Sequence, residues 1–255
     1  MNIAEEINGE RLVVLGWGRA ILMQIAHPMV AAGVADHSTF RDKPVSRYTR
    51  LHSTIQSMLA LTFGPAAERQ AAIDRINAIH DRVNGTLKAS AGRFAAGTPY
   101  SATDPALLLW VEATLRDSMP LAYETFVAPL GRGGREAYVQ EGEEVAARLR
   151  IPLAERPTTL DGLTRYLDEM LAGDALAVTP IARELAQEVI APPYSRALGP
   201  LSRLNRLATI GLLPPRLRRE YGFSWTADDE AALSRWASRT RRLRRLCPDR
   251  LARWR

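Results

Sequence analysis

The stretch TDPALLLWVEATLRDSMPLAYETFV, residues 103–127, decides the fold class of this chain. It opens on Thr103-Asp104-Pro105, where capping side chains precede a proline that suits the first turn of a helix. The apolar run that follows predicts a long helix from Ala106 to about Val127, with a kink at Pro120. A helix this apolar is expected to lie in the core, with other elements packed around it.

Helix signals also recur along the rest of the chain, and strand signals do not. No segment alternates convincingly between apolar and polar residues, and no Asn-Gly or Asp-Gly pair separates strand-like runs. We expect an all-α fold in which residues 1–255 form a single domain. The caps, glycines and prolines predict helices at about 10–26, 28–35, 44–64, 65–87, 135–150, 160–171, 181–190 and 227–246.

The bulk composition is that of a globular chain that can bury a sizeable core, with 46% hydrophobic and 24% charged residues in 255. A single cysteine, Cys247, excludes an internal disulfide framework and any cysteine-rich metal site, and we expect a reducing, cytoplasmic compartment. The acidic start, residues 1–6, is not a secretory signal. The most apolar stretch, 12–35, is interrupted by Arg19 and His27, which favours a buried core helix over a transmembrane segment.

The net charge of +6 is concentrated at the C-terminus, where nine arginines lie between Arg235 and Arg255 against a single Asp249. Such a tail can contact nucleic acid, anionic lipid or an acidic partner, or it can be a solvated helix end. We expect the second case, with arginines largely in solvent, some of them paired with acidic surface, and no specific binding of nucleic acid. The apolar side of this last helix, which is expected to dock on the body, consists of Ala232, Leu233, Trp236, Leu243 and Leu246.

All four histidines, His27, His37, His52 and His80, lie in the first third of the chain, among predicted helices. His80 is the most informative, because it falls in an apolar stripe at helical spacing. That stripe is Ile73, Ile76, His80, Val83 and Leu87. An imidazole there is costly unless its nitrogens are occupied, either as a satisfied core residue or by a metal bond and a hydrogen bond.

Arg50 and Thr54 are four residues apart and share one face of the helix predicted at 44–64, with Arg47 one turn earlier. An arginine and a hydroxyl that converge on a pocket can donate hydrogen bonds to a bound oxygen species or a carboxylate. The alternative is a surface ion pair for Arg50 and an indifferent position for Thr54.

The helix predicted at 10–26 is broken beside His27 by Pro28, which frees backbone carbonyls and redirects the side chain. With Asp36 and His37 nearby in sequence, His27 could supply acid–base groups to a pocket. The alternative is that His27 caps the carbonyls that the proline frees.

Four stretches taken in order resemble the rubber-oxygenase catalytic-domain family, which includes the bacterial latex-clearing proteins and the membrane-bound MpaB-type oxygenase of mycophenolic acid biosynthesis. They are QIAHPMVAAGVADHSTF (24–40), RLHSTIQSMLALTFG (50–64), IHDRVNGT (79–86) and YSATDPALLLWVEATLRDS (100–118). The resemblance extends through residues 123–130 and 214–218 and so covers nearly the whole chain. The chain looks most similar to the short bacterial members, most of which have no assigned reaction.

The resemblance implies a globin-like helical core that holds one haem b through a proximal histidine, which matches His80. The distal arginine and threonine of the family match Arg50 and Thr54, and its threonine on the following helix matches Thr114. With Arg47, these residues are the candidates for contact with the cofactor or its ligand.

The chain also departs from the family pattern at two positions. Ser53 stands where latex-clearing proteins have a lysine, so a closed state with lysine on the iron is not available. Glu112 stands where short members often have histidine, which puts in doubt a second ligand or base there. Asp36 is the nearest candidate for the distal carboxylate that latex-clearing proteins use as a base.

The function expected from these features is that of a haem-b-dependent oxygenase or oxidase. It would act on an apolar or aromatic small molecule, with O₂ or peroxide. One alternative is a non-catalytic protein that binds haem or a gas ligand. Another is a helical module whose basic tail binds nucleic acid or membrane.

Overall fold

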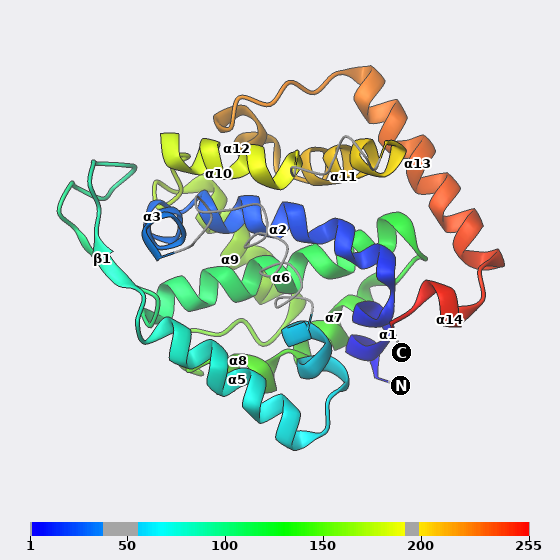
Figure 1. Ribbon diagram of the computed structural model, residues 1–255, viewed down its shortest axis with the longest axis horizontal. Helices are drawn as coiled ribbons and strands as arrows, with labels where there is room; N and C mark the ends of the chain where they lie inside the picture. The colour runs from blue at the N-terminus through cyan, green and yellow to red at the C-terminus, as the bar shows by residue number, and fades with distance from the viewer. Residues whose placement is uncertain (1, 38–55, 192–198, 255) are drawn as a thin grey trace.

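A computed structural model, which describes residues 2–37, 56–191 and 199–254, shows a mostly helical single domain with one small sheet (Figure 1). The prediction of an all-α class is therefore confirmed in its main part. The elements are α1 Ile3–Gly9, the 3₁₀-helix η1 Arg11–Val14, α2 Leu15–Ile25, α3 Pro28–His37, α5 Ala66–His80, β1 Asn84–Thr86, β2 Pro99–Ser101, α6 Pro105–Phe126, α7 Gly131–Glu141, α8 Glu143–Arg148, α9 Leu160–Ala172, α10 Pro180–Ile190, α11 Pro200–Gly211, α12 Pro215–Glu220, α13 Ala227–Leu246 and α14 Asp249–Ala252. Residues 56–63 are also helical and end at Gly64, as predicted.

The helix predicted at 106–127 is α6, and it lies in the core as expected. The side chain of Asp104 caps it by accepting a hydrogen bond from the backbone N–H of Ala106, and Pro105 occupies its first turn. The helix continues through Pro120, and its large side chains Trp110 and Phe126 are fully buried.

α2 lies between α6 and α11, and two glycines allow the close approach (Figure 1). A Cβ atom at Gly16 would lie 2.8 Å from the carbonyl oxygen of Ser118 in α6. A Cβ atom at Gly18 would overlap the side chain of Thr209 in α11. These glycines therefore serve helix packing, and the predicted break at Pro28 is confirmed by a bend of 105° between the segment 11–25 and α3.

No single helix within the described segments is long and apolar enough to cross a membrane. The bent pair Arg11–Ile25 and Pro28–His37 meets the criteria of length and composition when its two parts are taken together.

The helix predicted at 65–87 ends early, at His80, and the prediction that it continues to Leu87 is wrong. The chain turns after Asp81 and forms β1, which pairs antiparallel with β2, so the absence of strands predicted from the sequence is also wrong. Gly85 lies opposite Tyr100, whose ring occupies the space of a glycine Cβ. Pairing with residues some fifteen positions away thus overrides the local helical pattern of Val83 and Leu87.

Two further boundaries differ from the prediction. The acidic start forms a helix, α1, because Asn2 and Glu5 form a reciprocal capping box. The single helix predicted at 135–150 is divided at Gly142 into α7 and α8.

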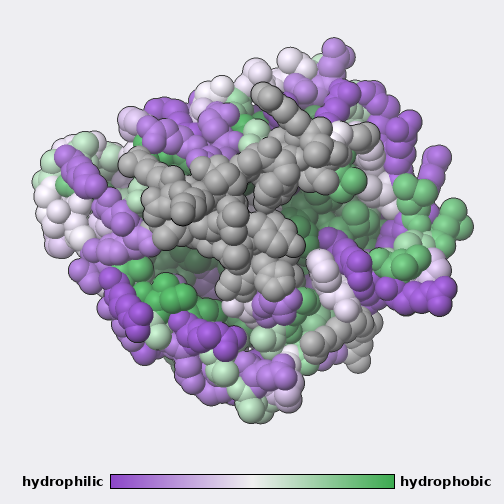
Figure 2. All heavy atoms as spheres, in the orientation of Figure 1, coloured by the Kyte–Doolittle hydropathy of each residue, from purple (hydrophilic) through white to green (hydrophobic). Residues whose placement is uncertain are grey.

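The last helix begins at the predicted cap, Thr226, and the predicted apolar side docks in part: Ala232 and Leu233 are buried and Trp236 packs against the core. From Leu233 the buried stripe continues through Ala237 and Thr240, at spacings of four and three, and leads to Arg244. Leu243 and Leu246 lie off this stripe, and Leu246 is 83% exposed. Hydrophobic surface is accordingly visible at the right-hand end of the molecule, where α13 meets α14 (Figure 2).

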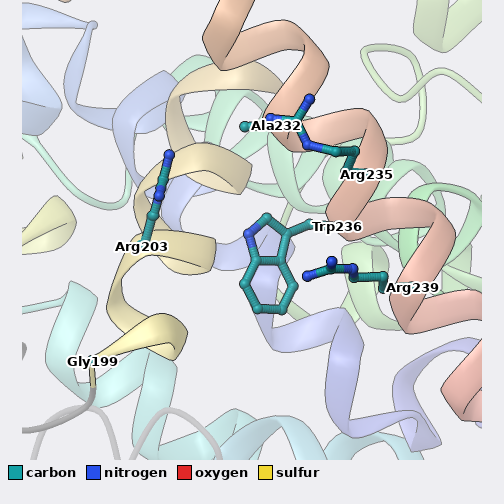
Figure 3. A pocket seen from close by; sticks show the side chains of 6 residues that line it. All are labelled: Gly199, Arg203, Ala232, Arg235, Trp236 and Arg239. Atoms are coloured by element: carbon teal, nitrogen blue, oxygen red, sulfur yellow. The ribbon is translucent and has the colours of Figure 1, made fainter.

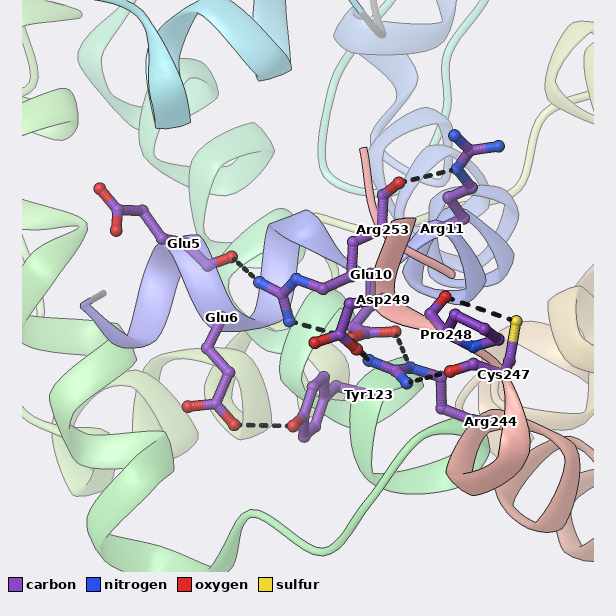
Figure 4. Close-up of polar contacts among 10 residues, drawn as sticks. All are labelled: Glu5, Glu6, Glu10, Arg11, Tyr123, Arg244, Cys247, Pro248, Asp249 and Arg253. Atoms are coloured by element: carbon purple, nitrogen blue, oxygen red, sulfur yellow. Dashed lines mark hydrogen bonds and ion pairs between the residues drawn. The ribbon is translucent and has the colours of Figure 1, made fainter. Parts of the chain in front are cut away.

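Most of the described arginines of the basic tail are exposed, as expected, but Arg244 and Arg253 pair with an acidic side chain. Arg244 donates to both carboxylate oxygens of Glu10, at 2.6 and 2.7 Å, and Arg253 donates to the same carboxylate at 2.9 Å (Figure 4). The backbone of Trp254 donates to the carbonyl of Gly9. The two ends of the chain are therefore fastened together around one buried carboxylate.

Candidate functional site

A cavity of about 660 Å³ lies between α5 and α6, within the range of about 300–1,000 Å³ that is typical of sites for small molecules and cofactors. α5 contributes one face to it, and α6 contributes the opposite wall. Residues 56–63, α1, α2, α7 and α8 also contribute to the lining. The apolar lining includes Trp17, Ile21, Met58, Leu61, Ile73, Ile76, Leu108, Val111, Leu115, Met119, Val145 and Leu149, and the charged lining includes Arg69, His80, Glu112, Arg116, Glu141, Glu144 and Arg148.

His80 lines this cavity from the last turn of α5, together with Ile73 and Ile76, so this half of the predicted stripe faces a pocket. Its ring makes no hydrogen bond within the part of the chain that the structure describes, and Nδ1 is buried without a partner. Burial lowers the pKa of His80, and the cation of Arg150 also lowers it, whereas Asp81 raises it. The neutral imidazole is the form that binds a metal ion, so His80 is suited to the role of an iron ligand.

Glu112 faces the same cavity from α6 and belongs to a buried charge network. Arg116 donates to Glu112 at 2.7 Å and to Glu143 at 2.9 Å, and the second carboxylate oxygen of Glu112 is buried without a hydrogen-bond partner. Burial raises the pKa of Glu112 although Arg116 opposes the shift. Glu112 therefore brings an ionisable side chain with an unpartnered oxygen to the cavity lining.

Thr114 does not line the cavity but forms hydrogen bonds with two residues that do. It is fully buried in α6, donates to the carbonyl of Val111 and accepts from the side chain of Gln24 at 3.1 Å. Gln24 and Val111 both line the cavity. Thr114 therefore holds a lining side chain in place.

His27 lies at the bend between α2 and α3, where it is buried away from this cavity. Its Nδ1 accepts a hydrogen bond from the backbone N–H of Met29 at 3.3 Å, and its ring packs on Phe94 with centroids 5.2 Å apart. It caps an amide of α3, whereas the alternative considered from sequence was a cap on carbonyls. Burial, and then the cation of Arg93, lower the pKa of His27 to about 4.

This shift predicts a pH dependence of stability. In the unfolded chain His27 is protonated below about pH 6.5, whereas in the folded protein it is protonated only below about pH 4. The contribution of neutral His27 to the free energy of unfolding is therefore full above pH 6.5 and declines as the pH falls from 6.5 to 4. The expected loss is about 3 kcal/mol at pH 4. Urea unfolding across this range measures it. His27→Asn keeps an acceptor for the backbone N–H of Met29 but cannot bind this proton. Its free energy of unfolding should therefore fall less steeply than that of the wild type as the pH is lowered, with a slope that differs by the uptake of one proton. Equal slopes would contradict the assignment.

Asp36 and His37 lie beside the small sheet, not at the cavity. Asp36 pairs with Lys88 at 2.6 Å and accepts from the hydroxyl of Tyr100 at 3.0 Å, and the hydrogen bond from Lys88 is the main reason why its pKa is lowered. A ring nitrogen of His37 lies 2.8 Å from the carbonyl oxygen of Asn84. The structure thus gives both residues partners that fasten α3 to the hairpin.

Arg47, Arg50, Ser53 and Thr54 lie outside the described residues, as does His52. The described continuation of their segment contributes Ser57, Met58, Leu61 and Thr62 to the cavity lining. Arg69 and Arg148 were not singled out from the sequence. Arg69 is eleven residues before His80, a spacing that places both on one helix face and could have identified it.

A second pocket, of about 480 Å³, lies between α11 and α13 (Figure 3). Arg203 projects toward it from α11, and Arg235, Trp236 and Arg239 border it from α13. The three arginines are exposed, so an anion held there would remain in a high dielectric and gain little. The cavity beside His80 is the stronger candidate.

The fold and the cavity define a helical protein with a candidate small-molecule site, and comparison with known proteins identifies its family. The chain belongs to the family described as ER-bound oxygenase mpaB/B'/Rubber oxygenase, catalytic domain, whose model matches residues 6–242. It is 25% identical over 236 residues to the uncharacterized protein Rv2237 of Mycobacterium tuberculosis and to the uncharacterized protein Mb2261 of Mycobacterium bovis. Each match covers 90% of this chain and 88% of the relative. No solved structure matches the chain.

Proposed function

We propose that this chain is a haem-b-dependent oxygenase or oxidase that acts on an apolar or aromatic small molecule in the cavity between α5 and α6. The observation that carries the proposal is His80, an imidazole in the wall of this cavity whose Nδ1 is buried without a partner. Membership of an oxygenase family supports the same conclusion. Haem, when bound, would supply the redox chemistry with O₂ or peroxide.

The chain's own residues would hold the iron, exclude water and orient the substrate. His80 is the proposed ligand, and Trp17, Leu115 and Met119 provide apolar wall that favours an apolar or aromatic substrate. Glu112, whose second carboxylate oxygen has no partner, is the proposed polar contact for the ligand on the α6 side. A globin-like arrangement of the helices around the cofactor is part of the proposal.

Arg50 and Thr54 stay proposed donors on the distal side. Their sequence spacing from Met58 and Leu61, which line the cavity, is that of one helix face. A cationic donor at such a position would stabilise negative charge that develops on a ligand oxygen.

The absorption spectrum of the purified protein after addition of haem b tests this proposal. We expect a Soret band that saturates at one haem per chain, and a protein that shows no band would contradict it. Consumption of O₂ or peroxide with a reductant and an apolar substrate then separates an oxygenase or oxidase from a protein that only binds haem or a gas ligand.

A further inference from the structure

One face of α5 forms a continuous wall of the cavity. It consists of Arg69, Ile73, Ile76 and His80, at spacings of four, three and four residues. Both polar members have a buried nitrogen without a hydrogen-bond partner, Nε in Arg69 and Nδ1 in His80. Each end of this wall therefore has a polar side chain with an unpaired nitrogen, and the residues between them are aliphatic.

Arg69 differs from the other arginines that line the cavity. Within the described residues it forms no hydrogen bond or ion pair, although it is half-buried. Arg148 pairs with Glu144 at 2.7 Å and donates to Gln70 at 2.9 Å. Arg116 is held by Glu112 and Glu143. A guanidinium that is partly removed from water and left unpaired is costly, and a planar oxyanion is its best partner.

We propose that Arg69 binds the carboxylate of the ligand in this cavity, with the apolar body of the ligand against Ile73 and Ile76. Eleven residues of α-helix place Arg69 about 16 Å along the axis from His80, so the ligand carries its charge at the end remote from His80. A carboxylate fits better than a phosphate, because Glu141 and Glu144 line the same cavity and would repel a dianion more strongly.

The carboxylate could come from a propionate of haem b, which rests on the proposed function, or from the substrate itself. Three probes distinguish these sources: haem b, haem b dimethyl ester, in which both propionates are blocked, and dodecanoate. Each is titrated into the wild-type chain and into Arg69→Leu and Arg69→Lys. Arg75→Leu is the matched control, because Arg75 is an exposed arginine of the same helix that does not line the cavity. Thermal melting confirms that the variants are folded.

If the propionate is bound, Arg69→Leu should weaken haem b about tenfold or more, leave the diester unchanged and be partly rescued by Arg69→Lys. If a substrate carboxylate is bound, the same loss should appear with dodecanoate and not with haem b. Arg75→Leu should match wild type throughout.

Wild-type affinity of Arg69→Leu for all three probes would overturn the inference and leave haem binding intact. Conversely, a wild-type chain that binds dodecanoate through Arg69 but no haem would overturn only the proposed function, and one that binds no probe would overturn both.

Discussion

Replacing His80 by alanine is expected to abolish the retention of haem b, with the Soret band falling more than about tenfold, since loss of outer-shell partners alone typically costs 10- to 100-fold in metal affinity. His80 is the described histidine that lines the cavity, and its unpartnered ring suits a metal bond. His37→Ala is the matched control, because that ring contacts Asn84 beside the sheet. It should keep the wild-type spectrum.

A second variant separates loss of the ligand from loss of the fold. His80→Gly leaves room for free imidazole, and addition of imidazole should restore the band if the only defect is the missing ligand. Haem content and spectrum equal to wild type in His80→Ala would show that another residue binds the iron. The same result in His37→Ala as in His80→Ala would show that the effect is not specific.

The sequence signals that held are those whose cause is local. Asp104, Thr159, Thr179 and Thr226 cap their helices as predicted or next to the predicted start, because a cap depends only on the next three residues. The bend at Pro28 is local in the same sense. Local signals were therefore sufficient for the helical class and for most helix boundaries.

The signals that failed depend on distant partners. Val83 and Leu87 continue a helical stripe in sequence, yet pairing of residues 84–86 with 99–101 takes the chain out of the helix. Leu243 and Leu246 are apolar, yet the face of α13 that is buried is the one that packs against α11 and α6. Neither outcome can be derived from a window of neighbouring residues.

The candidate site divides in the same way. The position of His80 on an apolar face could be predicted, because Ile76 and Ile73 precede it by one and two helical turns. Arg69 shares that face, but the role proposed for it rests on its having no partner among the described residues, which depends on where the acidic side chains lie after folding. The assignments of Arg47, Arg50 and Thr54 stay predictions, and His27, Asp36 and His37 have structural partners away from the cavity.

Replacing Glu10 by alanine is expected to lower the stability of the fold by about 3–5 kcal/mol, the cost of breaking a buried ion pair by removing one partner. Glu10 is 2% exposed and accepts hydrogen bonds from Arg244 and Arg253, so its loss removes the buried charge that the two arginines share and leaves Arg244 with only the exposed Asp249. It also removes the side-chain ion pairs between Glu10 and the C-terminal segment (Figure 4). Chemical unfolding in urea measures the effect, and the melting temperature should fall by roughly 6–20 °C.

Asp249 provides the matched control, because it pairs with the same Arg244 at 2.7 Å but its side chain is 77% exposed. Asp249→Ala should cost less than about 1 kcal/mol, since solvent screens an exposed pair. Glu10→Gln keeps the acceptor oxygen and loses the charge, so its stability should lie between those of Glu10→Ala and wild type. A Glu10→Ala variant no less stable than Asp249→Ala would show that both arginines reach solvent on losing their partner. The contact of Glu10 with Arg244 and Arg253 would then contribute little to the stability of the fold that supports the cavity.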